Sequence, residues 1–216
     1  MLKRYLDALA AKRVLGAIVA KTDDVRTVRW MGRSIWQYPL DAWLIQEVIT
    51  ELRPDLIIET GTYQGGSAYF FACLCDLMNH GDIISIDIAS HGTMPHPRIT
   101  YITGSSVDPQ IVSTVAQRIA QSKAQRILVS LDSDHRSAHV LQELEIYARY
   151  VPQGSYIHIQ DGCIDELSMF RHARPGPKVA VKTFLKRHPE FIRDRALEQR
   201  YVLTAHPYGW ITRKTS

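Results

Sequence analysis

Hydrophobic residues along the chain gather in short β-rich runs that alternate with segments of helical periodicity. The runs are DLIIE (55–59), DIISIDI (82–88), RITYI (98–102), RILVSLD (126–132) and SYIHIQD (155–161). Apolar residues recur at helical spacing in the segments between them, at 41–53, 67–79, 109–122 and 136–150. Strand and helix in alternation predict a parallel sheet with helices on both faces. The near-continuous apolar runs agree with strands buried on both sides.

Acidic and hydroxyl residues stand where several of these helices should begin. Asp41 and Ser67 are predicted N-caps, because their side chains can accept hydrogen bonds from free backbone N–H groups. Asp108 precedes Pro109, and this pair is typical of a cap followed by proline in the first turn. Asp134 is expected to cap the helix that follows it.

The two ends of the chain show different patterns. Residues 175–191 predict a loop and then a helix, and 201–213 predict two short strands around His206–Gly209 that form an antiparallel hairpin at the sheet. Residues 1–21 predict an amphipathic helix that packs on the domain or on a partner subunit. Its apolar stretch is too short to cross a bilayer, although contact with a membrane surface is an alternative.

Composition limits the class of protein. A length of 216 residues with 45% hydrophobic residues fits one globular domain. The net charge of +4 is spread along the chain, and no dense basic tract with interleaved aromatics appears, so a nucleic-acid partner is not expected. The three cysteines include no C-x-x-C pair, which argues against a zinc site or a disulfide framework and fits the reducing cytoplasm.

Candidate chemistry collects at one edge of the predicted sheet, because ligands bind beyond the carboxyl ends of parallel strands. Strand by strand, the residues there are Glu59, Gly61, Tyr63, Gly65 and Ser67; Asp87; Gly104, Ser105 and Ser106; Asp132, Asp134 and His135; and Gln160 and Asp161. Carboxylates that lie close together repel one another unless a cation balances them. The edge is therefore expected to bind a metal, a cationic ligand or both.

The turn in IIETGTYQGGS (57–67) narrows the choice of ligand. It lacks the G-x-G of dinucleotide sites and the lysine of the P-loop, and the bulky Tyr63 occupies its middle. An adenosyl cofactor without phosphates, carrying a positive sulfonium, suits this acidic edge better. Asp87, at the end of the next strand, can accept hydrogen bonds from ribose hydroxyls. The alternative is that Asp87 only caps the following loop.

Longer motifs strengthen this interpretation. IETGTYQGGSA, SIDI, GSSVD and LDSDH together resemble the class I S-adenosylmethionine-dependent methyltransferases. PDLIIETGTYQGGSAYFFA, LDSDHRSAHVLQELEIYARYVPQGSYIHIQDG and PGPKVAVKTFL are similar to the cephalosporin hydroxylase / rhamnosyl O-methyltransferase family over roughly 28–213. The resemblance implies a Rossmann-like α/β fold: a mainly parallel seven-stranded sheet with an antiparallel C-terminal hairpin and helices on both faces. We divide the chain into an N-terminal helical or lid segment (1–40) and a methyltransferase domain (41–216).

The resemblance also implies roles for particular residues. The expected cofactor-binding residues are Glu59, Gly61, Thr62, Tyr63, Gly65, Ser67, Asp87 and Ser106. Asp132, Gln160 and Asp161 match metal-binding positions, and oxygen ligands of this kind suit Mg²⁺. Asp132 and His135 are the expected catalytic residues. The histidine would accept the proton of a substrate hydroxyl near neutral pH.

Gln160 departs from the family pattern, which commonly has glutamate there. Losing one carboxylate lowers the negative charge of the site and weakens the case for a metal. The expected function is a cytoplasmic, Mg-assisted O-methyltransferase acting on a hydroxyl of a sugar, glycolipid or secondary metabolite. Two alternatives stay open: a hydroxylase-associated protein, as one family name suggests, and a non-catalytic binding protein on the same scaffold. A homo-oligomer is plausible from the N-terminal helix.

Several nearby residues admit a structural role as readily as a functional one. Trp30, Trp36, Tyr38 and Trp43 fit core or lid packing, although aromatic faces can also stack on a sugar ring. His139 and His158 are expected to be structural, and His158 lies within a predicted strand.

Overall fold

A seven-stranded sheet organises the part of the chain that the computed structural model describes, residues 2–21 and 28–214. The strand order is β5-β4-β3-β6-β7-β9-β8. β3, β4, β5, β6 and β7 run parallel to one another, whereas β9 is antiparallel to both β7 and β8. The strands are β3 (Leu56–Thr60), β4 (Asp82–Asp87), β5 (Ile99–Thr103), β6 (Ile127–Leu131), β7 (Tyr156–Ile159), β8 (Phe191–Arg193) and β9 (Trp210–Arg213). The predicted mainly parallel sheet with antiparallel C-terminal strands is confirmed.

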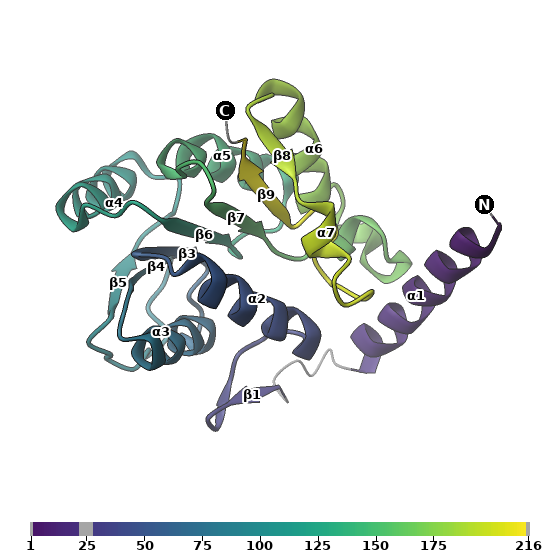
Figure 1. Cartoon of the computed structure of the whole chain (residues 1–216), viewed down its shortest axis with the longest axis horizontal. Helices are drawn as coiled ribbons and strands as arrows, with labels where there is room; N and C mark the ends of the chain where they lie inside the picture. Colours follow the sequence, from purple (N-terminus) through teal and green to yellow (C-terminus); the bar gives the residue numbers. More distant parts are fainter. Residues whose placement is uncertain (1, 22–27, 215–216) are drawn as a thin grey trace.

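Helices cover both faces of the sheet (Figure 1). They are α2 (Pro39–Leu52), α3 (Gly66–Met78), α4 (Pro109–Ser122), α5 (Ser137–Tyr147), α6 (Pro177–Arg187) and the short α7 (Arg195–Glu198). Alternate residues of a strand point to opposite faces. In β3, Ile58 therefore packs in the core under α4, α5 and α6, and Ile57 packs in the core under α2, α3 and α7.

The helix starts agree only in part with the predicted caps. Asp108 caps α4 as expected, since its carboxylate accepts hydrogen bonds from the backbone N–H groups of Gln110 and Ile111. Asp41 is not a cap: α2 begins at Pro39, and the buried Asp41 carboxylate accepts from the C-terminal segment instead. Ser67 is not a cap either, because α3 already begins one residue earlier.

The antiparallel strands do not both come from residues 201–213. β9 does, but β8 is formed by Phe191–Arg193, before α7. Residues 201–205 run beside the body as a loop, where the Ala205 carbonyl accepts from the Cys163 N–H at 2.9 Å and the Ala205 N–H donates to Asp41. Their backbone groups are satisfied by α2 and the loop after β7 instead of by a strand.

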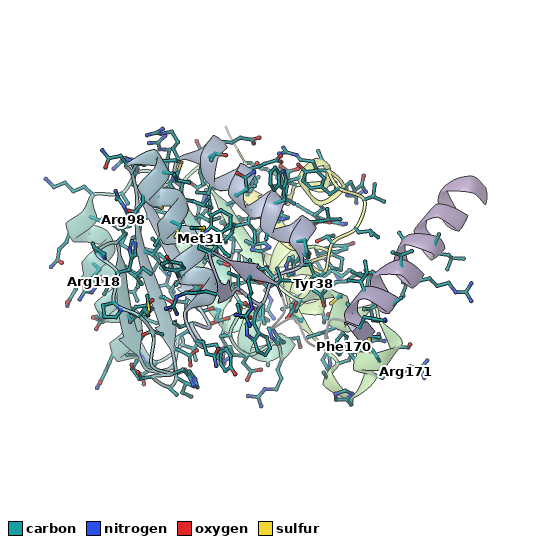
Figure 2. All side chains as sticks on the ribbon, turned by 90° about the horizontal axis from the view of Figure 1, so that it is seen from below. Met31, Tyr38, Arg98, Arg118, Phe170 and Arg171 are labelled. Atoms are coloured by element: carbon teal, nitrogen blue, oxygen red, sulfur yellow. The ribbon has the colours of Figure 1, made fainter. Side chains whose placement is uncertain are left out.

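The N-terminal segment contacts the body chiefly through the C-terminal end of its helix. α1 (Leu2–Lys21) extends away from the body in Figure 1, and its C-terminal end carries Val19, which packs with Cys163, Leu167 and Ala205. Figure 2 shows Tyr38 and Phe170 near this end of α1. A small hairpin follows, β1 (Arg29–Trp30) and β2 (Arg33–Ser34). Across the described residues, no helix combines the length and the apolar character needed to cross a membrane.

Three short 3₁₀ helices complete the described elements. They are η2 (Ala148–Tyr150), η3 (Gly162–Asp165) and η4 (Ser168–Ala173). η3 directly follows the carboxyl end of β7, so it helps to set the position of Asp161 at that edge.

Candidate functional site

A cavity of 730 Å³ opens where the parallel strands end, as expected for an open α/β sheet. Its size is within the usual range for small-molecule sites, roughly 300–1,000 Å³. Residues at or after the ends of the five strands β3 to β7 contribute to its wall, together with the segment before α2. Its lining includes these residues predicted from the sequence: Gly61, Thr62, Tyr63, Ser67, Asp87, Ser106, Asp132, His135 and Asp161.

The turn between β3 and α3 is held close to the end of β6. The Gly61 N–H donates to the Ile86 carbonyl at 2.8 Å, and Gly61 has a φ of +90°. A Cβ atom at this position would lie 2.0 Å from the backbone oxygen of Asp132. Only glycine allows this approach, which brings the turn and Asp132 to one cavity.

Asp87, at the end of β4, lies beside this turn and is oriented by two backbone N–H groups. Its Oδ2 accepts from the Tyr63 N–H at 2.7 Å, and its Oδ1 accepts from the Ala89 N–H at 3.1 Å. The Tyr63 ring lies edge-on to Trp36, with 5.1 Å between ring centroids, and approaches His91 on its other side. Each Asp87 oxygen retains a lone pair for a further donor, such as a ribose hydroxyl.

Glu59 lies behind the cavity wall. It is fully buried and accepts a hydrogen bond from the Ser85 hydroxyl, which also lies 2.6 Å from the Thr62 hydroxyl. Burial raises the pKa of Glu59 to about 7, against the opposing effect of hydrogen bonds from Ser67 and Ser85. Glu59 and Gly65 are thus the two residues of the predicted cofactor turn that do not line the cavity. Glu59 supports the turn from inside.

Two carboxylates and an imidazole converge at the β6–β7 end of the cavity. Ligand atoms of Asp132, His135 and Asp161 all lie within 4.8 Å of one another, and His135 Nε2 is 3.4 Å from Asp161 Oδ2. Burial, followed by the nearby charge of Asp161, raises the pKa of Asp132 well above its usual value. A cation between the two carboxylates would remove this repulsion. The donor set therefore fits a divalent metal ion.

Gln160 is turned toward the protein interior. It is buried, its Oε1 accepts from Gln37 Nε2, and its own Nε2 donates to the Ser130 hydroxyl at 3.2 Å. Its side chain is not part of the cavity lining. A metal-ligand role for Gln160 stays a prediction, and it requires the amide to leave these partners.

Asp161 is placed by the C-terminal segment. It has a φ of +56°, and its backbone N–H donates to His206 Nδ1 at 2.8 Å. His158 is in β7, three residues before Asp161. It is fully buried against Trp210 and His206, in line with its expected structural role. Burial lowers the pKa of His158 well below its usual value, so the ring is neutral.

Asp134 shapes the loop at the cavity rim. Its carboxylate accepts from the backbone N–H of Arg136 at 2.9 Å, directly before α5, and pairs with the Arg136 guanidinium. This pairing lowers the pKa of Asp134 to about 2. Asp134 is therefore not the predicted cap: the N-cap of α5 is Arg136, and Asp134 instead accepts from the backbone of that residue. Both residues also line the cavity.

Some residues of the cavity wall are not predicted from the sequence. Trp36 and His139 both line the cavity, although the sequence favours a structural role for His139 and leaves the role of Trp36 open. His139 is in the first turn of α5, and His135 is in the loop before that helix, so both lie near the carboxyl end of β6. Ile88, directly after Asp87, also lines the cavity with 77% of its surface exposed.

Comparison with known proteins gives a consistent result. A family model described as rhamnosyl O-methyltransferase/CmcI matches residues 23–214. The rhamnosyl O-methyltransferase of Mycobacterium tuberculosis H37Rv is 30% identical over 190 residues, which cover 85% of this chain and 77% of that protein. The Mycobacterium leprae protein of the same name is 30% identical over 195 residues, covering 87% and 84%.

Solved structures share the fold. A CmcI structure described with Mg-SAM has a TM-score of 0.66 and 20% identity, covering 89% of this chain and 78% of that one. The methyltransferase MycE in complex with Mg, SAH and mycinamycin VI has a TM-score of 0.55 and 16% identity, covering 93% and 53%. Because the family model matches residues 23–214 of its 216, this chain belongs to the rhamnosyl O-methyltransferase/CmcI family and has the class I methyltransferase fold.

Proposed function

We propose that the protein transfers a methyl group from S-adenosylmethionine to a hydroxyl group of a small-molecule acceptor, either a sugar or glycolipid or a secondary metabolite. The observation that carries this proposal is the single cavity lined both by the turn with Asp87 and by the cluster of Asp132, His135 and Asp161. A methyl donor and a hydroxyl acceptor must meet in one enclosed space, because positioning supplies much of the rate of such a transfer.

The cofactor end follows from the local geometry. Asp87 offers its carboxylate to the ribose hydroxyls, while the Gly61–Ser67 turn, whose backbone is held close to β6, receives the methionine portion. The nearby carboxylates favour the positive sulfonium. Family relatives named as rhamnosyl O-methyltransferases and neighbours described with SAM or SAH support this assignment.

The acceptor end contains the candidate metal ligands. Asp132 and Asp161 would hold Mg²⁺, which prefers carboxylate oxygens. When bound, Mg²⁺ supplies a positive charge that stabilises the deprotonated form of a nearby hydroxyl. Both carboxylates lie on elements fixed by backbone contacts, Asp132 by the Gly61 turn and Asp161 by His206.

His135 acts as the base in this proposal. Its side chain is about one-third exposed, which leaves it open to the cavity, and Asp161 lies close enough to orient the ring. Imidazole is the side chain most often used as a general base around neutral pH. His135 would accept the hydroxyl proton as the oxygen attacks the methyl carbon and the sulfur leaves.

Isothermal titration with S-adenosylhomocysteine tests the cofactor assignment, and no binding at millimolar ligand would overturn the proposal. Transfer of a labelled methyl group to rhamnosyl glycolipids and to hydroxylated secondary metabolites tests the acceptor class.

We expect EDTA to abolish methyl transfer and added Mg²⁺ to restore it. We also expect His135→Ala to lower kcat by roughly 10²–10⁴-fold, as is typical for loss of a general base.

Measuring oxygen uptake distinguishes a methyltransferase from the hydroxylase alternative, since methyl transfer consumes no oxygen.

For partners, we propose that exposed apolar residues of α1, Leu9 and Val14, contact either a second copy of the chain or a membrane surface in the cytoplasm. Sedimentation with and without anionic vesicles distinguishes the two. A protein that sediments as a monomer and does not bind vesicles would overturn both alternatives.

A further inference from the structure

A buried carboxylate stands behind the end of the cavity formed by the loops after β5 and β6. Glu143 of α5 is fully buried, and its Oε1 accepts from the hydroxyls of Ser106 at 2.6 Å and Ser133 at 2.7 Å. Its Oε2 has no hydrogen-bond partner within the described ranges. Burying a carboxylate is costly unless its surroundings use the charge. Methyl transfer as proposed above gives Glu143 no role.

His139 connects this carboxylate to the cavity. Its Nε2 lies 3.5 Å from Glu143 Oε1 and 3.3 Å from the Ser106 hydroxyl, while its side chain, 19% exposed, lines the cavity. Because Nε2 faces Glu143 and Ser106, Nδ1 is the ring nitrogen left for a ligand.

The charged groups facing His139 favour its protonated form. The hydrogen bond with Glu143, one turn along α5, raises the pKa of His139, and the charge of Asp134 raises it further. Burial and the charge of Arg136 oppose this rise, but they are outweighed. Ser106, from the loop after β5, is the uncharged group beside it.

The chemistry of this end suits a purine base. Ser105, Ser106 and His139 offer polar groups, and the exposed Ile88 offers an apolar surface next to Asp87. A flat heteroaromatic ring needs such a surface for its face and donors for its ring nitrogens. The other end of the cavity holds the acidic cluster, so the base of an adenosyl cofactor belongs here once Asp87 holds its ribose.

We propose that His139, held by the buried Glu143, donates a hydrogen bond from Nδ1 to a ring nitrogen of the cofactor's adenine, with Glu143 as the positioning residue. This inference rests on the proposed use of an adenosyl cofactor. Because the proton stays on His139 when adenine binds, affinity for the cofactor should fall as the pH rises through the pKa of His139.

The test is titration calorimetry with S-adenosylhomocysteine from pH 5.5 to 8.5 at fixed Mg²⁺. We expect wild-type affinity to fall by up to about tenfold per pH unit above the His139 pKa. Glu143→Gln keeps the shape and the serine contacts but removes the charge, so the fall should move to lower pH. His139→Gln should lower affinity at pH 6 and remove the pH dependence.

Glu145→Gln is the matched control. Glu145 is on the same helix and also contacts a histidine, with Oε2 2.7 Å from His188 Nε2, but it does not line the cavity. This variant should bind like the wild type at every pH. Equal behaviour of the Glu143 and Glu145 variants would overturn the inference.

Histidine NMR supplies a readout that does not depend on the variants. Binding of S-adenosylhomocysteine should raise the pKa of the His139 ring in the wild type, and an unchanged or lowered value would overturn the inference even if Glu143→Gln fails to fold. If the wild type binds no S-adenosylhomocysteine at any pH, the proposed function itself fails. If S-adenosylhomocysteine binds with the same affinity at every pH, only the proposed role of His139 is overturned and the proposed function stands.

Discussion

The acids at the carboxyl edge of the sheet differ in what surrounds them. Asp87 accepts from two backbone N–H groups, whereas Asp132 faces the charge of Asp161. Glu59 and Glu143 are fully buried, and each accepts a hydrogen bond from a serine hydroxyl. Residue type alone could not separate these roles, because they depend on partners that come from other strands.

The titration of Glu59 has a measurable effect on stability. Its pKa of about 7 in the folded protein exceeds the ordinary value of 4.5. The folded state therefore favours the protonated form, and stability is lost as the pH rises from about 4.5 through about 7. This difference corresponds to about 3 kcal/mol.

We expect Glu59→Gln to remove this loss. In urea unfolding without cofactor or metal, the stability of the variant relative to the wild type should rise by about 2.5 kcal/mol between pH 5 and pH 8. Stability curves that run parallel across this range would contradict the assigned pKa.

At the scale of elements, the parallel strands and β9 could be predicted from the sequence, whereas β8 could not. The apolar run 55–59 became β3 at Leu56–Thr60, since a strand buried on both faces must be apolar throughout. β8 has only three residues, too few for a pattern. The segment 201–205 has strand-like residues, but its hydrogen bonds go to Asp41 and Cys163. Contacts so distant in sequence leave no local signal.

The turn after β3 gives a prediction at this scale. Gly61→Ala would force a Cβ to within 2.0 Å of the Asp132 carbonyl oxygen, in addition to the strain of its positive φ. Gly154 is the matched control, with a φ of +76° and open space around it. We expect Gly154→Ala to cost about 1 kcal/mol.

Gly61→Ala should destabilise by at least about 2 kcal/mol more, because the turn must move away from β6. It should also weaken binding of S-adenosylhomocysteine, whereas Gly154→Ala should not. Chemical unfolding and calorimetry measure the two effects. Equal losses in both variants would show that the close approach is unimportant.

At the scale of the whole molecule, segments far apart in sequence share the support of Asp161. The buried Asp41 of α2 accepts from the Thr204 hydroxyl at 2.6 Å and from the Ala205 N–H at 2.9 Å. The adjoining His206 accepts from the backbone N–H of Asp161. The position of a candidate metal ligand thus depends on contact between the start of α2 and the loop before β9.

Removing Asp41 should affect both stability and metal binding. We expect Asp41→Ala to cost about 2–3 kcal/mol, because it leaves the buried Ala205 N–H without a partner, and to weaken Mg²⁺ binding. Asp108→Ala is the control, since it also deletes a carboxylate that accepts from two backbone N–H groups, but at the exposed start of α4. It should cost about 1 kcal/mol and leave Mg²⁺ affinity unchanged. Chemical unfolding and Mg²⁺ titration of both variants measure the two effects. Unaltered Mg²⁺ binding in Asp41→Ala would contradict the proposed link between Asp41 and the position of Asp161.

The sheet order also has a consequence for synthesis on the ribosome. β9 is later in the chain than β8, yet it lies between β7 and β8 and is the neighbour through which β8 joins the sheet. A nascent chain that ends before residue 206 already contains Asp132, His135 and Asp161, but it lacks the histidine that fixes the Asp161 backbone. Such an unfinished chain lacks the hydrogen bond that holds the Asp161 backbone, so we expect it to bind Mg²⁺ more weakly than the full chain.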